Sequence, residues 1–116
     1  MAKSILREKA KRFAISIIEL NKFLNDKREK VLSKQILRSG TSIGANLSEA
    51  EFAQSPSDLI NKSHVALKEA SETRYWLELL VETDYISQEQ FDKLFKDCSE
   101  LINMLVSGIK TLKDSK

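Results

Sequence analysis

The fold of this chain is decided by one stretch, Ser39-Gly40-Thr41-Ser42-Ile43-Gly44-Ala45-Asn46-Leu47-Ser48-Glu49-Ala50. Its two glycines stand four residues apart inside a segment whose neighbours otherwise indicate a long helix. Each glycine costs a helix about 0.5–1 kcal/mol relative to alanine, because the backbone loses more freedom on folding. We therefore expect another helix, of the same chain or of a second chain, to pack closely against the side of this helix that carries Gly40 and Gly44.

Apolar residues on both sides of this stretch recur every three or four positions, which is the spacing of one face of an amphipathic helix. The pattern predicts helices over residues 4–24, 26–53, 55–82 and 87–112. The connections between them are short, so consecutive helices must run antiparallel. The sequence therefore predicts an all-α fold, an antiparallel up-down-up-down four-helix bundle, in a single domain over residues 1–116.

Three of these helices carry a recognisable start signal. Ser55-Pro56-Ser57-Asp58 combines a capping serine with proline at the first helical position. Ser87 with Gln90, three residues later, forms a capping box, and Asp26 with Glu29 resembles one. We therefore expect the second helix to begin at Asp26, directly after the first helix ends.

Composition narrows the class of protein. The chain has 116 residues with 3 glycines and 1 proline, too few for a fold of many short strands and turns. Its single cysteine, Cys98, cannot form an internal disulfide and falls in an apolar helical row, so we expect a buried thiol. Charges begin in the first turn, and no uncharged run approaches the roughly 18 residues of a membrane span. These features favour a cytoplasmic protein with no membrane partner.

Motifs for enzymatic chemistry or cofactors are absent from the sequence. The Gly40–Gly44 spacing lacks the lysine and hydroxyl residue of a phosphate-binding P-loop. Glu49, Glu69 and Glu72 invite a carboxylate metal site, but di-iron centres of helix bundles need two Glu-x-x-His pairs. The only histidine, His64, has asparagine three positions before it. We therefore expect no metal, no cofactor and no enzymatic activity.

Polar side chains near the glycines are spaced to share a surface. Asn46 and Glu49 follow Arg38 by 8 and 11 residues. Both spacings are close to whole numbers of helical turns, so the three side chains lie near one face of the helix. Glu69 and Glu72 lie on the antiparallel neighbour. The pattern predicts a partly buried polar network that fixes the register of the two helices. A ligand or partner site built from the same residues is the alternative.

Charge is distributed unevenly along the chain. Residues 1–40 contain 11 Lys and Arg against 4 Asp and Glu, whereas residues 41–116 contain 8 against 13. Repeating such a basic surface around a ring of subunits would multiply phosphate contacts and make nucleic-acid binding steeply salt-dependent. A solvated outer helix face is the alternative interpretation. The residues that we predict to contact phosphate are Lys9, Arg12, Lys27, Arg28, Lys30 and Lys34.

Two segments resemble the signatures of a known family. The stretch from Arg38 to Ala50 closely resembles the first signature of four-helix bundle proteins encoded in intervening sequences of 23S ribosomal RNA genes. Residues 66–77 resemble the second signature, with Glu72, Trp76 and Leu77 in the expected places. The likeness covers nearly the whole chain, and a minor departure is Ala50, where many members carry glycine.

The family is similar to the accessory variability determinant of diversity-generating retroelements. The resemblance implies a cyclic homopentamer for both and, in the retroelement protein, a basic surface that binds nucleic acid and a reverse transcriptase. We therefore expect a homo-oligomeric, non-enzymatic scaffold or chaperone that binds RNA or DNA nonspecifically, with a nucleic-acid-processing protein as a further partner. A protein-interaction scaffold without nucleic-acid binding is the alternative.

Overall fold

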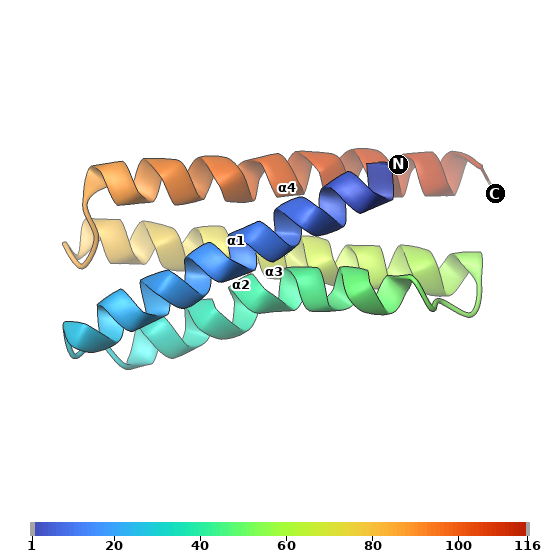
Figure 1. Ribbon diagram of the computed structural model, residues 1–116. Coiled ribbons are helices and arrows are strands. Elements are labelled where there is room, and N and C mark those ends of the chain that lie inside the picture. Colours follow the sequence, from blue (N-terminus) through green and yellow to red (C-terminus); the bar gives the residue numbers. More distant parts are fainter. Residues whose placement is uncertain (1, 116) are drawn as a thin grey trace.

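The computed structural model describes residues 2–115, with side chains from residue 5 onward. Every regular element in this range is a helix, and the elements are α1 (Ala2–Asp26), α2 (Val31–Ala50), α3 (Pro56–Glu82) and α4 (Gln88–Asp114). They form an elongated bundle of 47 × 21 × 20 Å in which consecutive helices run antiparallel (Figure 1). The predicted up-down-up-down four-helix bundle is confirmed, and the helix boundaries fall within three residues of those predicted, except at the start of α2.

Helices that are neighbours in sequence are also neighbours in space. α2 packs against both α1 and α3, and α3 packs against α4, whereas α1 meets α4 over a shorter contact. Figure 1 shows α1 crossing obliquely from α4, near the N-terminus, toward the start of α2. The α1–α2 and α3–α4 connections therefore lie at one end of the bundle, and the α2–α3 connection lies at the other.

Two of the predicted helix starts are confirmed. Ser55 accepts a hydrogen bond from the backbone N–H of Asp58 (3.1 Å), and Pro56 occupies the first position of α3. Ser87 accepts from the N–H of Gln90 (3.1 Å), whose side chain accepts in turn from the N–H of Ser87 (2.8 Å). Such caps satisfy N–H groups that the first helical turn leaves without a partner.

The start of α2 differs from the prediction. Asp26 is the last residue of α1, and α2 begins at Val31. Between them Arg28 adopts a left-handed backbone conformation with a φ of 66°, which interrupts the helical path. The Glu29 carboxylate then accepts hydrogen bonds from the N–H groups of the first three residues of α2 (3.2, 3.1 and 2.7 Å). Glu29, rather than Asp26, therefore caps this helix.

The core is one cluster of apolar side chains drawn from all four helices. It includes Ile17, Ile36, Leu77 and Leu101, all of which are almost completely inaccessible to solvent. Cys98 is buried among them, and burial raises the pKa of its thiol to about 12. Because a thiol that stays protonated at neutral pH is a poor nucleophile, Cys98 serves here as a core residue.

Gly40 and Gly44 form the contact between α2 and α1. A Cβ atom added at Gly40 would lie 2.8 and 2.9 Å from the Cγ1 and Cγ2 atoms of Ile17 on α1. At Gly44 the same atom would lie 3.7 Å from the backbone of Ala10, which is an ordinary van der Waals distance. The glycine row therefore faces another helix of the same chain, and only Gly40 is sterically required there.

We expect the two glycines to respond differently to alanine. Gly40→Ala places a methyl group against Ile17 and should lower the free energy of unfolding by about 1–2 kcal/mol, because overpacking outweighs the gain in helix propensity. Gly44→Ala meets no obstacle and should raise it by about 0.5–1 kcal/mol. Urea denaturation measures both changes, with Gly108→Ala on the open surface of α4 as the control for helix propensity alone. Equal responses at Gly40 and Gly44 would contradict the steric role of Gly40.

Candidate functional site

Basic side chains cluster at the turn between α1 and α2. Lys27, Arg28 and Lys30 lie in the turn, Lys34 lies in the first turn of α2, and all four are exposed. These four residues are called the basic turn. The Lys27 ammonium group lies 4.8 Å from the ring centre of Phe23, a cation–π contact at the surface. No Asp or Glu among residues 5–115 forms an ion pair with any of the four.

A hydrogen-bond network holds this turn in place. Glu29, which caps α2, is 8% exposed, and its backbone N–H donates to the carbonyl of Leu24 (2.9 Å). Asn21 on α1 donates through Nδ2 to the carbonyl of Ser33 on α2 (3.1 Å), and Asn25 donates to Asn21 Oδ1 (3.1 Å). These bonds tie the end of α1 to the start of α2, so the basic side chains project from a fixed backbone.

Lys9 and Arg12 lie apart from the basic turn. Both are on α1, where Arg12 lies 14 residues, or about 21 Å of helix, before the helix end. Lys9 pairs with Glu100 on α4 (2.9 Å), and Arg12 pairs with Glu8 (3.2 Å). The structure thus brings together four of the six predicted phosphate contacts. Lys22, exposed near the end of α1, lies closer to the turn than Lys9 or Arg12 but was not among the predicted contacts.

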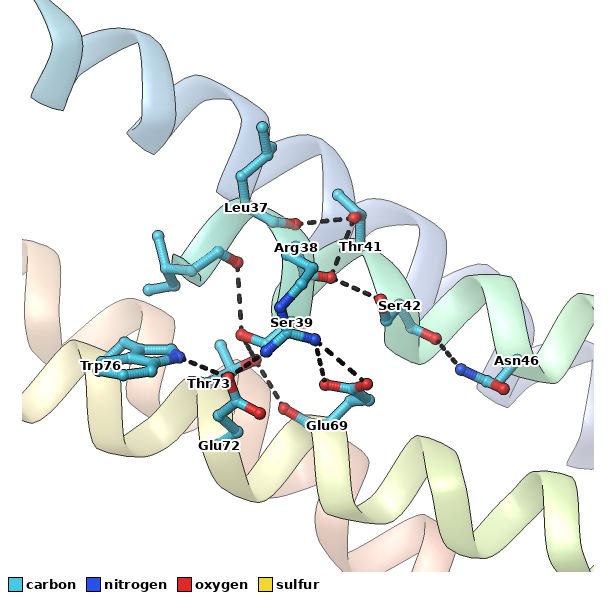
Figure 2. A network of polar contacts seen from close by, with 11 residues as sticks. Leu37, Arg38, Ser39, Thr41, Ser42, Asn46, Glu69, Glu72, Thr73 and Trp76 are labelled. Carbon is cyan, nitrogen blue, oxygen red and sulfur yellow. Dashed lines mark hydrogen bonds and ion pairs between the residues drawn. The ribbon is translucent and has the colours of Figure 1, made fainter. Parts of the chain in front are cut away.

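Arg38 links α2 to α3 through two carboxylates. Its guanidinium group donates to Glu69 Oε1 (3.2 Å) and to Glu72 Oε2, and Glu72 also accepts from the indole N–H of Trp76 (2.9 Å; Figure 2). Burial raises the pKa of Glu72, but the hydrogen bonds from Arg38 and Trp76 outweigh it and hold that pKa below its ordinary value of 4.5. The network therefore stabilises the fold fully at pH values above the ordinary pKa of Glu72. This stabilisation is lost as the pH falls through the lower pKa that Glu72 has in the folded protein.

A buried pair of hydroxyl groups lies beside this ion-pair network. Ser39 Oγ on α2 and Thr73 Oγ1 on α3 are 2.8 Å apart, and Thr73 donates to the backbone carbonyl of Glu69 (2.8 Å; Figure 2). Ser39 Oγ also lies 3.5 Å from the carbonyl of Ile36, so each hydroxyl has a backbone acceptor in its own helix as well as its partner across the two helices. A sliding movement of α2 along α3 would break the bond between the two buried hydroxyls, so the pair favours this register of the two helices.

The polar residues predicted to connect α2 and α3 form separate contacts, and Asn46 and Glu49 lie outside the cluster of Arg38, Glu69 and Glu72. Asn46 donates to the carbonyl of Ser42 in its own helix (2.8 Å), and Glu49 pairs with Lys62 on α3 (2.8 Å). The physical reason is the antiparallel path of α3, which places its earlier turns beside the end of α2 and its middle turns beside Arg38.

A groove runs along the outer side of α1 and α2. It has a volume of about 630 Å³, and the small residues Gly44, Ala45 and Ser48 of α2 line one wall. Arg7, Glu8 and Lys11 of α1 line the other wall, and Arg7 forms an ion pair with Glu51. This surface is called the α1–α2 groove, and it is a second candidate site on the same pair of helices that carries the basic turn.

The part of the chain that the structure describes offers no metal centre. Among residues 5–115, no three His, Cys, Asp or Glu side chains gather closely enough to hold a metal ion. Nor does any helix in the described range have the length and apolar composition needed to cross a membrane.

Comparison with known proteins identifies the family. A sequence profile described as "23S rRNA-intervening sequence protein" matches residues 2–107. This chain belongs to the 23S rRNA-intervening sequence protein family. It is similar to a protein with unknown function from the S23 ribosomal protein family of Bacteroides thetaiotaomicron VPI-5482, whose crystal structure was determined at 1.70 Å resolution. The two share 54% sequence identity over 95% of this chain and 99% of that chain, with a TM-score of 0.93. No curated protein matches this chain.

In this 23S rRNA-intervening sequence protein, the two signature-like segments face each other. Residues 38–50 lie on α2 and residues 66–77 lie on α3, and the bonds of Arg38 and Ser39 join them. Gly40, in the first segment, forms the contact with α1. These segments therefore hold three helices together, and the basic turn lies outside both of them.

Proposed function

We propose that this 23S rRNA-intervening sequence protein is a non-enzymatic scaffold that binds RNA or DNA through the phosphate backbone, with the basic turn as the contact surface. The observation that carries the proposal is the unpaired state of Lys27, Arg28, Lys30 and Lys34 within the described residues. Six other basic residues, Lys9 among them, are held in ion pairs. Within the described residues, lysines without an ion pair also occur elsewhere, such as Lys68 and Lys96, but they are spread over different helices and are not gathered in one turn.

The attraction of the basic turn for anions comes from its side-chain charges. Lys30 and Lys34 lie at the N-terminal end of α2, where the Glu29 carboxylate already accepts from the first N–H groups and offsets the helix dipole. Four exposed cations close together nevertheless raise the potential felt by a phosphate. Contacts of this kind fix the position of a nucleic acid without reading its sequence.

Acidic residues limit the surface that a nucleic acid can cover. The α3–α4 connection lies at the same end of the bundle as the basic turn (Figure 1) and carries the exposed residues Glu82, Asp84 and Glu89 on or beside it. Phosphate groups are repelled there and attracted at the basic turn. A bound strand would therefore lie on the α1–α2 side of the bundle end.

The family description supports RNA as the ligand, because it names an intervening sequence of 23S rRNA. The likeness to the accessory variability determinant of diversity-generating retroelements, which rests on the signature segments, supports nucleic-acid binding and a nucleic-acid-processing protein as a further partner. A scaffold of this kind would act in the cytoplasm, where ribosomal RNA is found.

Charge reversal at the basic turn tests the proposal. A variant with Lys27→Glu, Arg28→Glu and Lys30→Glu should bind labelled single-stranded RNA at least about tenfold more weakly at low salt, because phosphate contacts dominate such binding. The slope of log affinity against log salt should fall in magnitude by about 2, or about 0.7 for each lost contact. Fluorescence anisotropy over a range of salt concentrations measures both quantities.

A matched control separates a local site from net charge. The variant Lys96→Glu, Lys110→Glu and Lys113→Glu reverses three exposed charges on α4 and should bind RNA as the unchanged protein does. Equal weakening in both variants would contradict a site at the basic turn. Absence of RNA and DNA binding by the unchanged protein at low salt would overturn the function and favour a scaffold for proteins alone.

We further propose that the chain assembles into a ring, a homopentamer by its likeness to the retroelement protein. Tyr75 on α3 and Val106 on α4 are 53% and 50% exposed and offer apolar surface for contact between subunits. A ring would repeat the basic turn in each subunit, so several weak phosphate contacts would act together on one nucleic acid.

Light scattering tests the assembly. The purified chain should have a mass of about five times the 13.2 kDa of one chain. Tyr75→Glu should lower this mass by placing a charge in the subunit contact, whereas Gln35→Glu, at an exposed position on α2, is the control. A mass of 13.2 kDa for the unchanged protein would contradict self-association.

A further inference from the structure

α1 carries apolar side chains on two opposite sides. One side faces the core through residues such as Ile17, which is fully buried. The other side carries Ile15 and Ile18, which are 49% and 41% exposed although β-branched aliphatic residues are usually buried. Lys11 and Lys22 continue this side of the helix, each four residues from the nearer isoleucine. We call these two isoleucines and two lysines the α1 outer row.

α3 exposes an aromatic side chain beside negative charge on the side away from the core. Tyr75 is 53% exposed, and the exposed residues Glu78 and Glu82 follow it by three and seven positions. These spacings place all three side chains on one side of the helix. We call these three residues the α3 outer row. It joins apolar surface to negative charge, whereas the α1 outer row joins apolar surface to positive charge.

The charges of both rows have no partner within the chain. Among residues 5–115, no ion pair includes a lysine of the α1 outer row or a glutamate of the α3 outer row. By contrast, Lys9, on another side of α1, is paired with Glu100 of α4. Unpaired cations beside one exposed apolar surface and unpaired anions beside another make the two surfaces complementary.

Charges of the opposite sign lie at the edges of both rows. On α1, Glu19 lies to one side of the isoleucines, and Asp26 lies past Lys22 beside the basic turn. On α3, Lys68 lies two helical turns before Tyr75. None of the three lies between the members of a row, so the apolar centre of each surface borders on the charges of its own row.

The two rows point to opposite sides of the bundle. α1 and α3 each pack against α2 and α4 but do not contact each other in the described part of the chain. They therefore occupy opposite corners of the bundle, and Figure 1 shows α1 in front of α3. Because each row faces away from the core, one chain can use both rows at once, each with a different neighbour.

We propose that the α1 outer row of one chain binds the α3 outer row of a second copy of this chain. The inference rests on the assembly proposed above and names the two surfaces that form its subunit contact. Tyr75 packs against Ile15 and Ile18 of the neighbouring copy, and the lysines and glutamates pair at the edges of this contact. A contact between two different surfaces adds copies in one direction and closes into a ring when the rotation between copies permits it.

Other occupants explain less of the surface. A nucleic acid would gain little from the two isoleucines, because bases stack on aromatic side chains. It would also be repelled by the glutamates of the α3 outer row. A different protein bound to either row would leave the other row without a partner, whereas a second copy covers both.

Charge reversal tests the pairing of the two rows. One variant reverses the α1 outer row (Lys11→Glu, Lys22→Glu), and a second reverses the α3 outer row (Glu78→Lys, Glu82→Lys). Each should weaken association at least about tenfold, because like charges then face each other. A variant with all four changes restores opposite charges at every contact without altering the net charge, and it should regain the mass of the unchanged protein. Light scattering over a dilution series measures association.

Removal of the isoleucines tests the apolar part of the contact without any change in charge. Ile15→Gln with Ile18→Gln should lower the mass toward the 13.2 kDa of one chain. Ile5→Gln is the matched control, because Ile5 is also on α1 and is 55% exposed but lies on another side of the helix. It should leave the mass unchanged. Circular dichroism and urea unfolding verify that each variant is folded.

The outcomes separate this contact from the other proposals. An assembled protein whose mass survives either charge reversal, or is not regained with all four changes, would overturn the pairing of the rows and leave self-association standing. A mass of 13.2 kDa for the unchanged protein would overturn both. All these variants keep the basic turn, so each chain should still bind RNA. An assembled protein that binds no RNA would overturn the nucleic-acid function and not the contact between copies.

Discussion

The close contact of Gly40 with Ile17 sets the position of α1 on α2, and the outer surface of the protein depends on it. α1 meets α4 only over a short contact, so α2 provides most of its support. With no side chain at Gly40, Ile17 lies directly against the α2 backbone. This seating brings Asn21 within hydrogen-bond distance of Ser33 and so holds the basic turn in place. It also places the two walls of the α1–α2 groove side by side.

α2 joins two other helices of the bundle. One side accepts α1 through Gly40, and the other is fixed to α3 by the hydroxyl pair of Ser39 and Thr73 and by the ion pairs of Arg38. Consecutive residues of one segment thus face different helices. This explains why the signature-like stretch is rich in small and polar residues although it lies in a bundle. Its role is to position the helices, whereas the contact surface that we propose lies outside it, at the basic turn.

Features determined by local interactions were predictable from the sequence. The four helices follow from apolar spacing, and the caps at Ser55 and Ser87 follow from contacts over three residues. The start of α2 was not predictable in this way, because Glu29 acts as a cap only after Arg28 adopts a left-handed conformation. A capping-box pattern carries no information on that backbone geometry.

Features determined by neighbouring helices were predicted only in part. The sequence indicates that both glycines permit close packing, but the difference between them depends on which atoms of α1 lie opposite. Likewise, the pairing of Glu49 with Lys62 depends on the register of α3.

A double-mutant cycle of Gly40→Ala with Ile17→Ala tests the contact between α1 and α2 most directly. We expect Gly40→Ala to destabilise the protein when Ile17 is present and to be neutral or stabilising when Ile17 is replaced by alanine, a coupling of about 1–2 kcal/mol in the free energy of unfolding. The same effect of Gly40→Ala in both backgrounds would contradict it.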